Sequence, residues 1–249
     1  MTTLYNGNCV DEMSKIADNS VDLIYTDLPY ATKTFGKCTD CKWDKPIDLD
    51  KMWAEFMRIK KLHTPIFMSC NVKLGFDLMS TCPKKCPFRY DLIWIKGEIG
   101  ETPCKTGFLH SKRQPLRSHE LVYVFYERQP FYDLSSHPYT DMSTKSGMVG
   151  KDNLVYSSSV KQVQNKKYDP PLPNSLLHVK SERGKHSTQK PLGLMEWILK
   201  YYSKEDDVVV DCCMGSGSMG VACKESNRQF IGIELNPEIY EDAQKRMGL

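Results

Sequence analysis

The stretch VVVDCCMGSGSMG, Val208–Gly220, decides the fold of this chain. Its apolar run ends at Asp211, and glycines at Gly215 and Gly217 lead into residues that favour a helix. A buried strand that passes through a glycine-rich turn into a helix is the repeating unit of α/β proteins with a parallel sheet. The next apolar run, QFIGI, is followed by Glu234. We therefore expect Asp211 and Glu234 to lie at the carboxyl ends of two strands of such a sheet.

This turn predicts a binding site for a nucleoside-bearing cofactor. Glycines let a ligand approach the backbone at the start of the helix, and an acidic residue at the end of the following strand can bind ribose hydroxyls. The residues expected to bind the cofactor here are Asp211, Gly215, Ser216, Gly217 and Glu234. A glycine-rich turn that only tightens packing is the simpler alternative.

NAD is another alternative, because Gly215-x-Gly217-x-x-Gly220 matches the dinucleotide fingerprint. Two features disfavour it. Only about 30 residues follow Gly220, too few for the second half of a dinucleotide-binding sheet. The carboxylate of Asp211 also precedes the glycines, where it would repel a pyrophosphate and attract a cationic cofactor.

A second candidate site lies near the amino terminus. The apolar run Leu23–Tyr25 ends in Thr26-Asp27-Leu28-Pro29-Tyr30, a carboxylate, a proline and an aromatic ring. Active groups of open α/β sheets lie beyond the carboxyl ends of the strands, which is where this segment falls. Alone it would be read as a turn, but together with a nucleoside-cofactor turn it predicts a catalytic site.

The remaining pattern continues the alternation of strands and helices, with helices expected on both faces of the sheet. The helix after position 48 has Asp48 or Asp50 as its N-cap, and the helix after Lys190 has Thr188 as its cap. Between positions 127 and 183 the periodicity fails, which is typical of a functional or mobile insertion. Strands are expected near 4–5, 21–25, 65–70, 90–96, 120–126, 207–213 and 229–235, and helices near 10–16, 49–62, 191–202, 216–226 and 237–247.

The length of 249 residues, 40% hydrophobic and 26% charged, fits either one large α/β domain or a core domain with a small insertion. No apolar run approaches the roughly 20 residues that span a bilayer, and the start lacks the layout of an export signal. We therefore expect a soluble cytoplasmic protein. The net charge is only +3, but residues 145–190 carry nine Lys/Arg against three Asp/Glu, and residues 105–117 carry four basic residues and no acidic one. This asymmetry favours a polyanionic partner over a merely solvated loop.

The ten cysteines indicate a reducing compartment, because no export signal accompanies them. Cys38, Cys41, Cys82 and Cys86 could together bind zinc through four thiolates. Such spacings also arise by chance in a cysteine-rich chain, so no metal site is predicted.

Three motifs together resemble the amino-group DNA methyltransferases in which the catalytic motif precedes the cofactor motif. Asp27-Leu28-Pro29-Tyr30 resembles the family's Asp-Pro-Pro-Tyr, and residues 211–217 resemble its Asp-Pro-Phe-x-Gly-Ser-Gly loop. Residues 186–191, HSTQKP, resemble its His-x-Thr-Gln-Lys-Pro segment. Two departures stand out: Cys212-Cys213-Met214 replaces Pro-Phe-x, and Leu28 replaces the first proline.

The resemblance implies a Rossmann-like methyltransferase fold, α/β and circularly permuted, with a mostly parallel twisted sheet. Residues 1–126 would form the catalytic half, 127–183 the target-recognition region and 184–249 the half that binds S-adenosylmethionine. The implied reaction transfers a methyl group to N6 of adenine, flipped out of a specific duplex DNA sequence, as in restriction-modification. N4 of cytosine is the alternative target, and a catalytically inactive DNA-binding relative is the alternative class. The protein would act as a monomer or homodimer.

The resemblance also assigns roles to residues. Asp27 and the Leu28 carbonyl would hold the target amine, Pro29 would keep Leu28 extended, and Tyr30 would stack on the base. Glu234 would bind the ribose of the cofactor and Asp211 would lie near its amino-acid moiety. Secondary candidates for cofactor binding are Lys190 and Asn8, those for the base pocket are Phe35 and Trp43, and those for DNA phosphates are Lys105, Lys112, Arg113 and Arg117.

Overall fold

The computed structural model describes residues 1–31, 36, 45–141, 166–182 and 189–249. The chain divides into two compact units, one formed by Met1–Tyr132 with Ser175–Leu249 and the other by Asp133–Asn174. The large unit contains β1 (Thr2–Asn6), α1 (Cys9–Met13), β2 (Leu23–Asp27), α2 (Leu49–Ile59), β3 (Ile66–Cys70), α3 (Val72–Thr81), β4 (Phe88–Ile95), the 3-10 turn η1 (Phe108–His110), β5 (His119–Phe125), β8 (Leu176–His178), α4 (Leu192–Tyr202), β9 (Val208–Asp211), α5 (Ser218–Glu225), β10 (Gln229–Glu234) and α6 (Pro237–Met247). The small unit contains β6 (Tyr139–Asp141) and β7 (Lys166–Tyr168).

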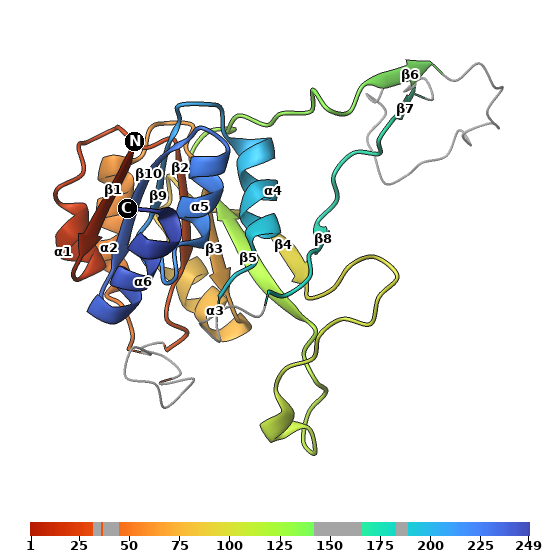
Figure 1. Cartoon of the computed structure of the whole chain (residues 1–249), viewed down its shortest axis with the longest axis horizontal. Helices are drawn as coiled ribbons and strands as arrows, with labels where there is room; N and C mark the ends of the chain where they lie inside the picture. Colours follow the sequence, from red (N-terminus) through yellow and green to blue (C-terminus); the bar gives the residue numbers. More distant parts are fainter. Residues whose placement is uncertain (32–35, 37–44, 142–165, 183–188) are drawn as a thin grey trace. The chain divides into compact units, whose positions relative to one another are not determined.

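The large unit is built on one eight-stranded sheet, in the order β1-β10-β9-β2-β3-β5-β4-β8 (Figure 1). Strand β5 pairs antiparallel with both β3 and β4, and the other neighbouring pairs are parallel. The expected mostly parallel α/β sheet is confirmed. Strands β9 and β2 lie side by side at its centre, and from there the chain runs towards β10 on one side and β3 on the other.

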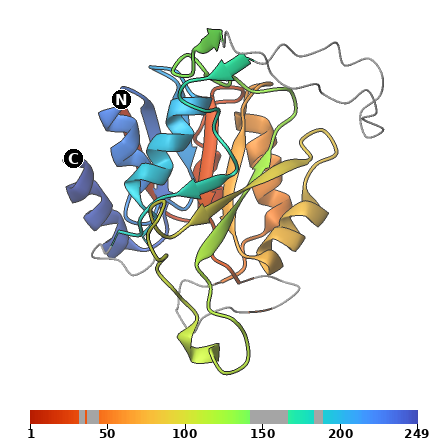
Figure 2. The same ribbon diagram turned by 90° about the vertical axis from the view of Figure 1, so that its right-hand side faces the viewer.

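Helices cover both faces of this sheet, with α4, α5 and α6 on one side and α2 and α3 on the other (Figure 2). The alternation of side chains along β2 explains why both faces can be buried. Leu23 and Tyr25 pack towards α4–α6, and Ile24 and Leu28 pack towards α1–α3. The amphipathic faces of the helices complete two apolar layers, in which residues such as Phe56 and Ile198 are fully buried.

Most expected elements are present, with several corrections. The Asp48 side chain caps α2 as expected, accepting a hydrogen bond from Lys51 N, but α2 ends at Ile59. Thr188, the expected cap of the next helix, lies outside the described residues. Pro191 occupies the N-cap position of α4, and Glu182 Oε1 accepts a hydrogen bond from Leu192 N at 2.8 Å.

Two further corrections concern regions where the sequence pattern is weak. Helix α3 was not predicted, although Asn71 caps it by accepting a hydrogen bond from Leu74 N at 2.9 Å. Residues 127–183 were expected to lack regular elements, yet they contain β6, β7 and β8. Strand β8 pairs with β4 and so belongs to the large unit, whereas β6 and β7 form an antiparallel pair in the small unit. Within the described residues, no helix is long and apolar enough to cross a membrane.

Candidate active site

The two predicted sites meet at the centre of the sheet. Asp27 ends β2 and Asp211 ends the neighbouring strand β9, so two motifs far apart in sequence share one edge. The chain leaves these two strands in opposite directions across the sheet. Such a switch point opens a crevice beyond the strand ends, where ligands of α/β proteins bind.

A series of ion pairs of alternating charge begins at the Asp27 carboxylate. Lys190 Nζ lies 2.5 Å from Asp27 Oδ2 and 3.3 Å from Glu120 Oε2. Lys96 Nζ binds the other oxygen of Glu120 at 2.5 Å. Lys190 and Lys96 are almost completely buried, so the ion pairs experience little screening by water. The structure thus places Lys190 directly beside the predicted catalytic motif.

The charges in this series of ion pairs shift the pKa values of the two carboxyl groups, Asp27 and Glu120. Burial raises the pKa of Asp27, and the ammonium of Lys190 opposes that shift. Burial also raises the pKa of Glu120, but Lys190 and Lys96 outweigh it and lower the pKa to about 2. Among the described residues, Asp27 Oδ1 has no hydrogen-bond partner, although it is buried. An unpartnered buried acceptor is costly, and its presence at a strand end indicates a site that awaits a donor.

Tyr30 is held in the same network. Its hydroxyl donates to Glu120 Oε2 at 3.1 Å, and Lys190 Nζ lies 5.7 Å from the centre of its ring. The ring is half-buried, so one end is fixed while part of its surface remains accessible. This is what a stacking platform requires.

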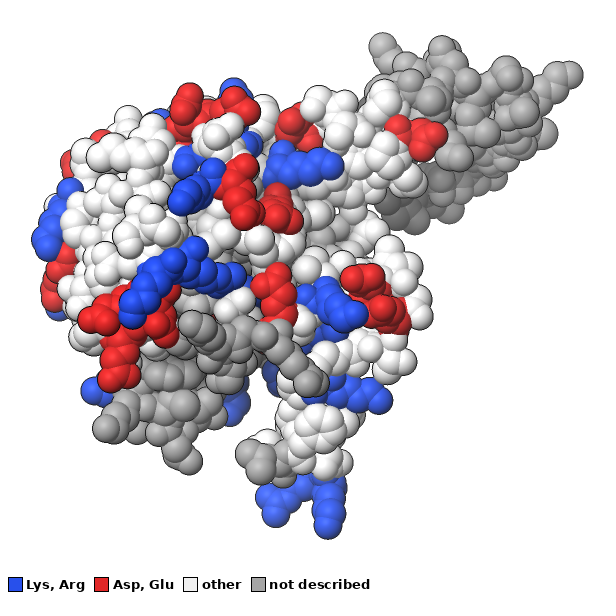
Figure 3. Space-filling model, viewed as in Figure 1, with Lys and Arg blue, Asp and Glu red and all other residues white. Residues whose placement is uncertain are grey.

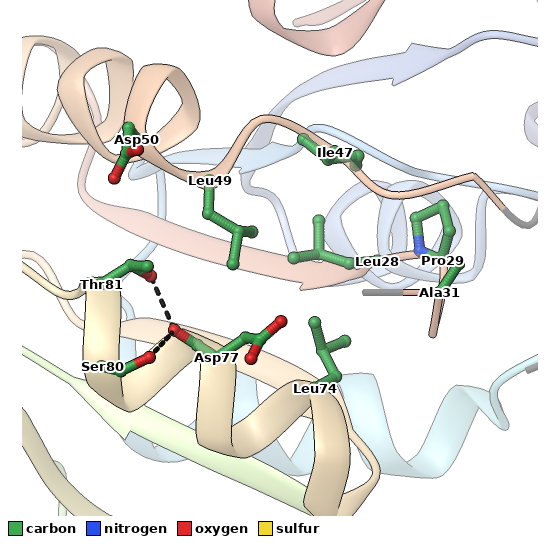
Figure 4. A pocket seen from close by; sticks show the side chains of 10 residues that line it. All are labelled: Leu28, Pro29, Ala31, Ile47, Leu49, Asp50, Leu74, Asp77, Ser80 and Thr81. Atoms are coloured by element: carbon green, nitrogen blue, oxygen red, sulfur yellow. Dashed lines mark hydrogen bonds between the residues drawn. The ribbon is translucent and has the colours of Figure 1, made fainter. Parts of the chain in front are cut away.

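Leu28 and Pro29 face a small cavity of about 170 Å³ on the α2–α3 side of the sheet (Figure 4). The Asp77 carboxylate of α3 points into this cavity. Its lining residues are Leu28, Pro29, Ala31, Ile47, Leu49, Asp50, Leu74, Asp77, Ser80 and Thr81. The side chain of Leu28 is therefore used for packing, which leaves its backbone as the group that can serve chemistry.

The cofactor loop after β9 is braced by two acidic side chains. Asp211 is buried and accepts a hydrogen bond from Cys213 N at 3.1 Å. Glu234 accepts from Gly215 N at 3.0 Å and from Asn236 N at 2.9 Å. Burial raises the pKa of both carboxyl groups. A cationic ligand beside Asp211 would offset that cost.

The glycines of the loop and of the helix that follows it differ in function, because one leaves space for a ligand and the others allow close packing against α6. Gly215 adopts φ +52°, and a Cβ built on it meets no atom within 4 Å among the described residues other than its two chain neighbours, so a ligand can approach its backbone. Gly217 adopts φ +77°, and a Cβ there would lie 3.0 Å from Met247 Cε of α6. At Gly220 a Cβ would collide with Met247 Sδ at 2.3 Å, so this glycine serves helix packing. The open face at Gly215, beside the buried carboxylate of Asp211 and the half-buried carboxylate of Glu234, fits a nucleoside cofactor with a cationic end.

Other predicted cofactor residues lie around this loop. Ser216 Oγ accepts from Arg246 Nη1 at 3.0 Å, and that guanidinium also donates to Ser218 Oγ at 3.1 Å. Ser218 in turn donates to the Lys190 backbone carbonyl at 2.8 Å, which connects the loop to the ion pairs around Asp27. Asn8 caps α1, accepting a hydrogen bond from Val10 N at 2.9 Å.

The predicted phosphate-binding residues lie on an arm, residues 97–118, that connects β4 to β5 and projects from the sheet (Figure 1). Because β4 runs in the same direction as β2, the arm leaves the edge that carries Asp27. Backbone hydrogen bonds between Thr106 and Arg117 close its neck. Basic side chains gather at its tip (Figure 3), and the four predicted residues are all exposed: Lys105, Lys112, Arg113 and Arg117.

Some functional contacts were missed, and some predictions lie outside the described residues. Glu120 and Lys96 were not identified from sequence, although both stand where an apolar strand meets the arm. Phe35, Trp43, Cys38 and Cys41 fall outside the described residues. The other two cysteines of the zinc alternative, Cys82 and Cys86, follow α3.

Comparison with known proteins identifies the class. A family profile described as DNA methylase matches residues 21–245. The type II methyltransferase M.HindIII of Haemophilus influenzae is 44% identical over 304 aligned positions, covering 99% of this chain and 95% of that protein.

Two solved structures share the fold. The complex of M1.HpyAVI with S-adenosylmethionine has a TM-score of 0.62 at 21% identity and covers 99% of this chain and 100% of that one. The PvuII DNA methyltransferase, described as cytosine-N4-specific, has a TM-score of 0.65 at 15% identity, covering 98% of this chain and 86% of that one. The expected Rossmann-like fold is therefore confirmed.

Fold and site together define an S-adenosylmethionine-dependent methyltransferase that acts on amino groups of DNA. The chain belongs to the DNA methylase family, and the match extends over both the catalytic and the cofactor motifs. The expected cofactor, S-adenosylmethionine, is confirmed with it. An NAD-dependent enzyme, the alternative suggested by the glycine spacing, is excluded by this membership.

Proposed function

We propose that this protein methylates N6 of adenine within a specific sequence of duplex DNA, after the target base has left the helix. The observation that carries the proposal is the unpartnered, buried Oδ1 of Asp27 at the carboxyl end of β2. An exocyclic amine has two N–H donors, and this oxygen with the Leu28 carbonyl offers two acceptors at one point of the chain.

The chemistry follows from what these acceptors do to a poor nucleophile. The amine lone pair is delocalised into the base, and hydrogen bonds to Asp27 and Leu28 draw the nitrogen towards tetrahedral geometry. When bound, S-adenosylmethionine would supply a methyl group on a sulfonium; the nitrogen lone pair would form the new bond to that methyl carbon as the carbon–sulfur bond breaks, and neutral S-adenosylhomocysteine would leave. Asp27 holds the proton that the amine releases as the new nitrogen–carbon bond forms. No cysteine is needed as a nucleophile.

Neighbouring residues keep Asp27 in the form that this role requires. The ion pair with Lys190 occupies Oδ2 and favours the ionised carboxylate, so Oδ1 remains available to a donor. Tyr30, anchored through Glu120, offers a ring on which the flipped base can stack. Glu234 and Asp211 would bind the ribose and the amino-acid end of the cofactor beside the open face of Gly215.

DNA would bind through the arm and through residues 127–183. The four exposed basic residues of the arm lie on the same edge as Asp27 and carry charges suited to phosphates. These contacts position a duplex without reading its bases. Base recognition is assigned to the segment around the small unit, because a sequence-specific enzyme requires side chains that reach base edges.

The choice of adenine over cytosine rests on Asp27. In the family that the motif resembles, enzymes acting on cytosine typically carry serine at this position. Cytosine N4 remains the second candidate, because one solved structure with this fold acts there and both amines need an acceptor. A catalytically inactive relative is disfavoured by the intact Asp27 and Tyr30.

Product analysis distinguishes these candidates. The purified protein, S-adenosylmethionine and a mixed-sequence duplex are incubated, and the DNA is digested to nucleosides and separated by chromatography. N6-methyladenine is the expected product. N4-methylcytosine alone would overturn the choice of base, and the absence of any methylated nucleoside on DNA of all sequences would favour the inactive relative.

A further inference from the structure

Three cysteines that the proposed methyl transfer does not use come together beneath the cofactor loop. Cys9 opens α1, and Cys212 and Cys213 follow Asp211 at the end of β9. Their sulfur atoms all lie within 4.8 Å of one another. All three are reduced, so no disulfide accounts for the arrangement.

The spacing of the sulfur atoms is that of a shared metal ion. Thiolate sulfurs bind zinc at about 2.3 Å, so sulfurs on one ion lie roughly 4 Å apart. The upper limit of 4.8 Å between the three sulfur atoms is close to that separation, so small side-chain movements would let all three bind one ion. They come from two separate segments, α1 and the cofactor loop, so chain proximity explains only the neighbours Cys212 and Cys213.

The surroundings distinguish this cluster from ordinary packing of small side chains. Cys9 and Cys212 are 7% and 1% exposed and lie within the apolar layer under α1 and α2. Cys213 is only half-buried and gives an ion a path inwards.

We infer that Cys9, Cys212 and Cys213 form a binding site for a thiophilic metal ion, with three sulfur ligands on one ion. Soft thiolates select zinc, copper(I) or cadmium and reject magnesium and calcium, which require oxygen ligands. The bound ion would tie the start of α1 to the loop between Asp211 and Gly215. This inference does not depend on which base is methylated, or on methylation at all.

The test uses the full, metal-free, reduced protein and cadmium as a spectroscopic probe, titrated against a chromophoric chelator. Cadmium is expected to bind with a sulfur-to-metal charge-transfer absorption. Cys9→Ser and Cys213→Ser should each weaken the binding at least tenfold and reduce the absorption per ion. Cys223→Ser, buried in α5, and Cys86→Ser, from the other cysteine pair, are the controls and should bind as the wild type does.

Circular dichroism and metal-free melting temperatures check that each variant folds. If Cys9→Ser does not fold, Cys213→Ser decides, because its side chain is partly exposed. Unchanged cadmium affinity in Cys213→Ser, or no binding by the wild type, would overturn the inference. Calorimetry with S-adenosylmethionine on the same metal-free protein separates the two proposals, since cofactor binding without cadmium binding removes this site and leaves the proposed function intact.

Discussion

The Asp27 carboxylate shows how much of a site a single residue can define. Its place at the end of a buried strand was evident from sequence, because an apolar run stops there and a proline follows. The residues that hold it were not evident. Lys190, which precedes α4, binds Asp27, and Glu120 of β5 binds Lys190. Strand register and loop geometry bring these residues together, and no local sequence pattern shows it.

Replacing Asp27 tests its role. Asp27→Ala should reduce single-turnover methylation by roughly 10³-fold or more, because the acceptor for the amine is lost at the moment when charge develops. Calorimetry with S-adenosylmethionine should show cofactor binding close to that of the wild type, since the carboxylate acts on the base. Near-normal turnover in this variant would refute the mechanism.

Asp211 presents the opposite situation, a carboxylate that costs stability in the free protein. Burial raises its pKa well above the usual range, so folding favours its protonated form. Its contribution to stability is complete below the ordinary aspartate pKa and is lost as pH rises through the folded-state pKa. Asp211→Asn should therefore be more stable than the wild type at neutral pH.

Urea unfolding of ligand-free Asp211→Asn and wild-type protein at several pH values measures this difference. The stability gain of the variant should grow as pH rises from about 4. The same variant should bind S-adenosylmethionine more weakly, because the cationic end of the cofactor loses its partner. A gain that is constant with pH would show that ionisation of Asp211 is not the cause.

At the scale of elements, the sequence predicted the helices and strands whose hydrophobic periodicity is strong and missed those whose periodicity is weak. Helix α6 was predicted with its observed limits, because Asn236, Pro237 and the terminal Gly248 mark its ends. Helix α3 was missed because apolar side chains also lie on its exposed face: Val72 and Phe76 are 62% and 52% exposed. Strand β8 has three residues, too few for any periodicity to show.

The arm between β4 and β5 is the element whose function is most directly testable. If its basic residues contact phosphates, DNA affinity should fall steeply with salt concentration. Lys112→Ala and Arg113→Ala should each reduce the slope of log affinity against log salt by about one unit. Lys245→Ala, an exposed lysine on α6, is the matched control and should leave the slope unchanged. Unchanged slopes in both arm variants would exclude this surface.

At the scale of the whole molecule, the sequence predicts one core interrupted by a recognition region at residues 127–183, and that region stays a prediction. Within it, the structure separates Asp133–Asn174 as a compact unit of its own. The residues that flank the small unit, Tyr132 and Ser175, both belong to the large unit. Tyr132 packs against Tyr202 with ring centres 5.1 Å apart, and the Ser175 carbonyl accepts a hydrogen bond from Ile93 N at 2.8 Å.

Because Tyr132 and Ser175 are held by the large unit, the small unit can be deleted between them to test its proposed role in base recognition. Replacing Asp133–Asn174 by a flexible Gly-Ser linker leaves the eight-stranded sheet, the Asp27 network and the cofactor loop intact. The variant should fold, bind S-adenosylmethionine with unchanged affinity and retain salt-dependent DNA binding through the arm. It should lose the preference for its target sequence, a specificity ratio of roughly 10³ or more.

The control is a full chain that carries the same linker at both ends of the small unit. Sequencing of methylated DNA with detection of modified bases gives the result, and site-specific methylation by the deletion variant would place recognition elsewhere.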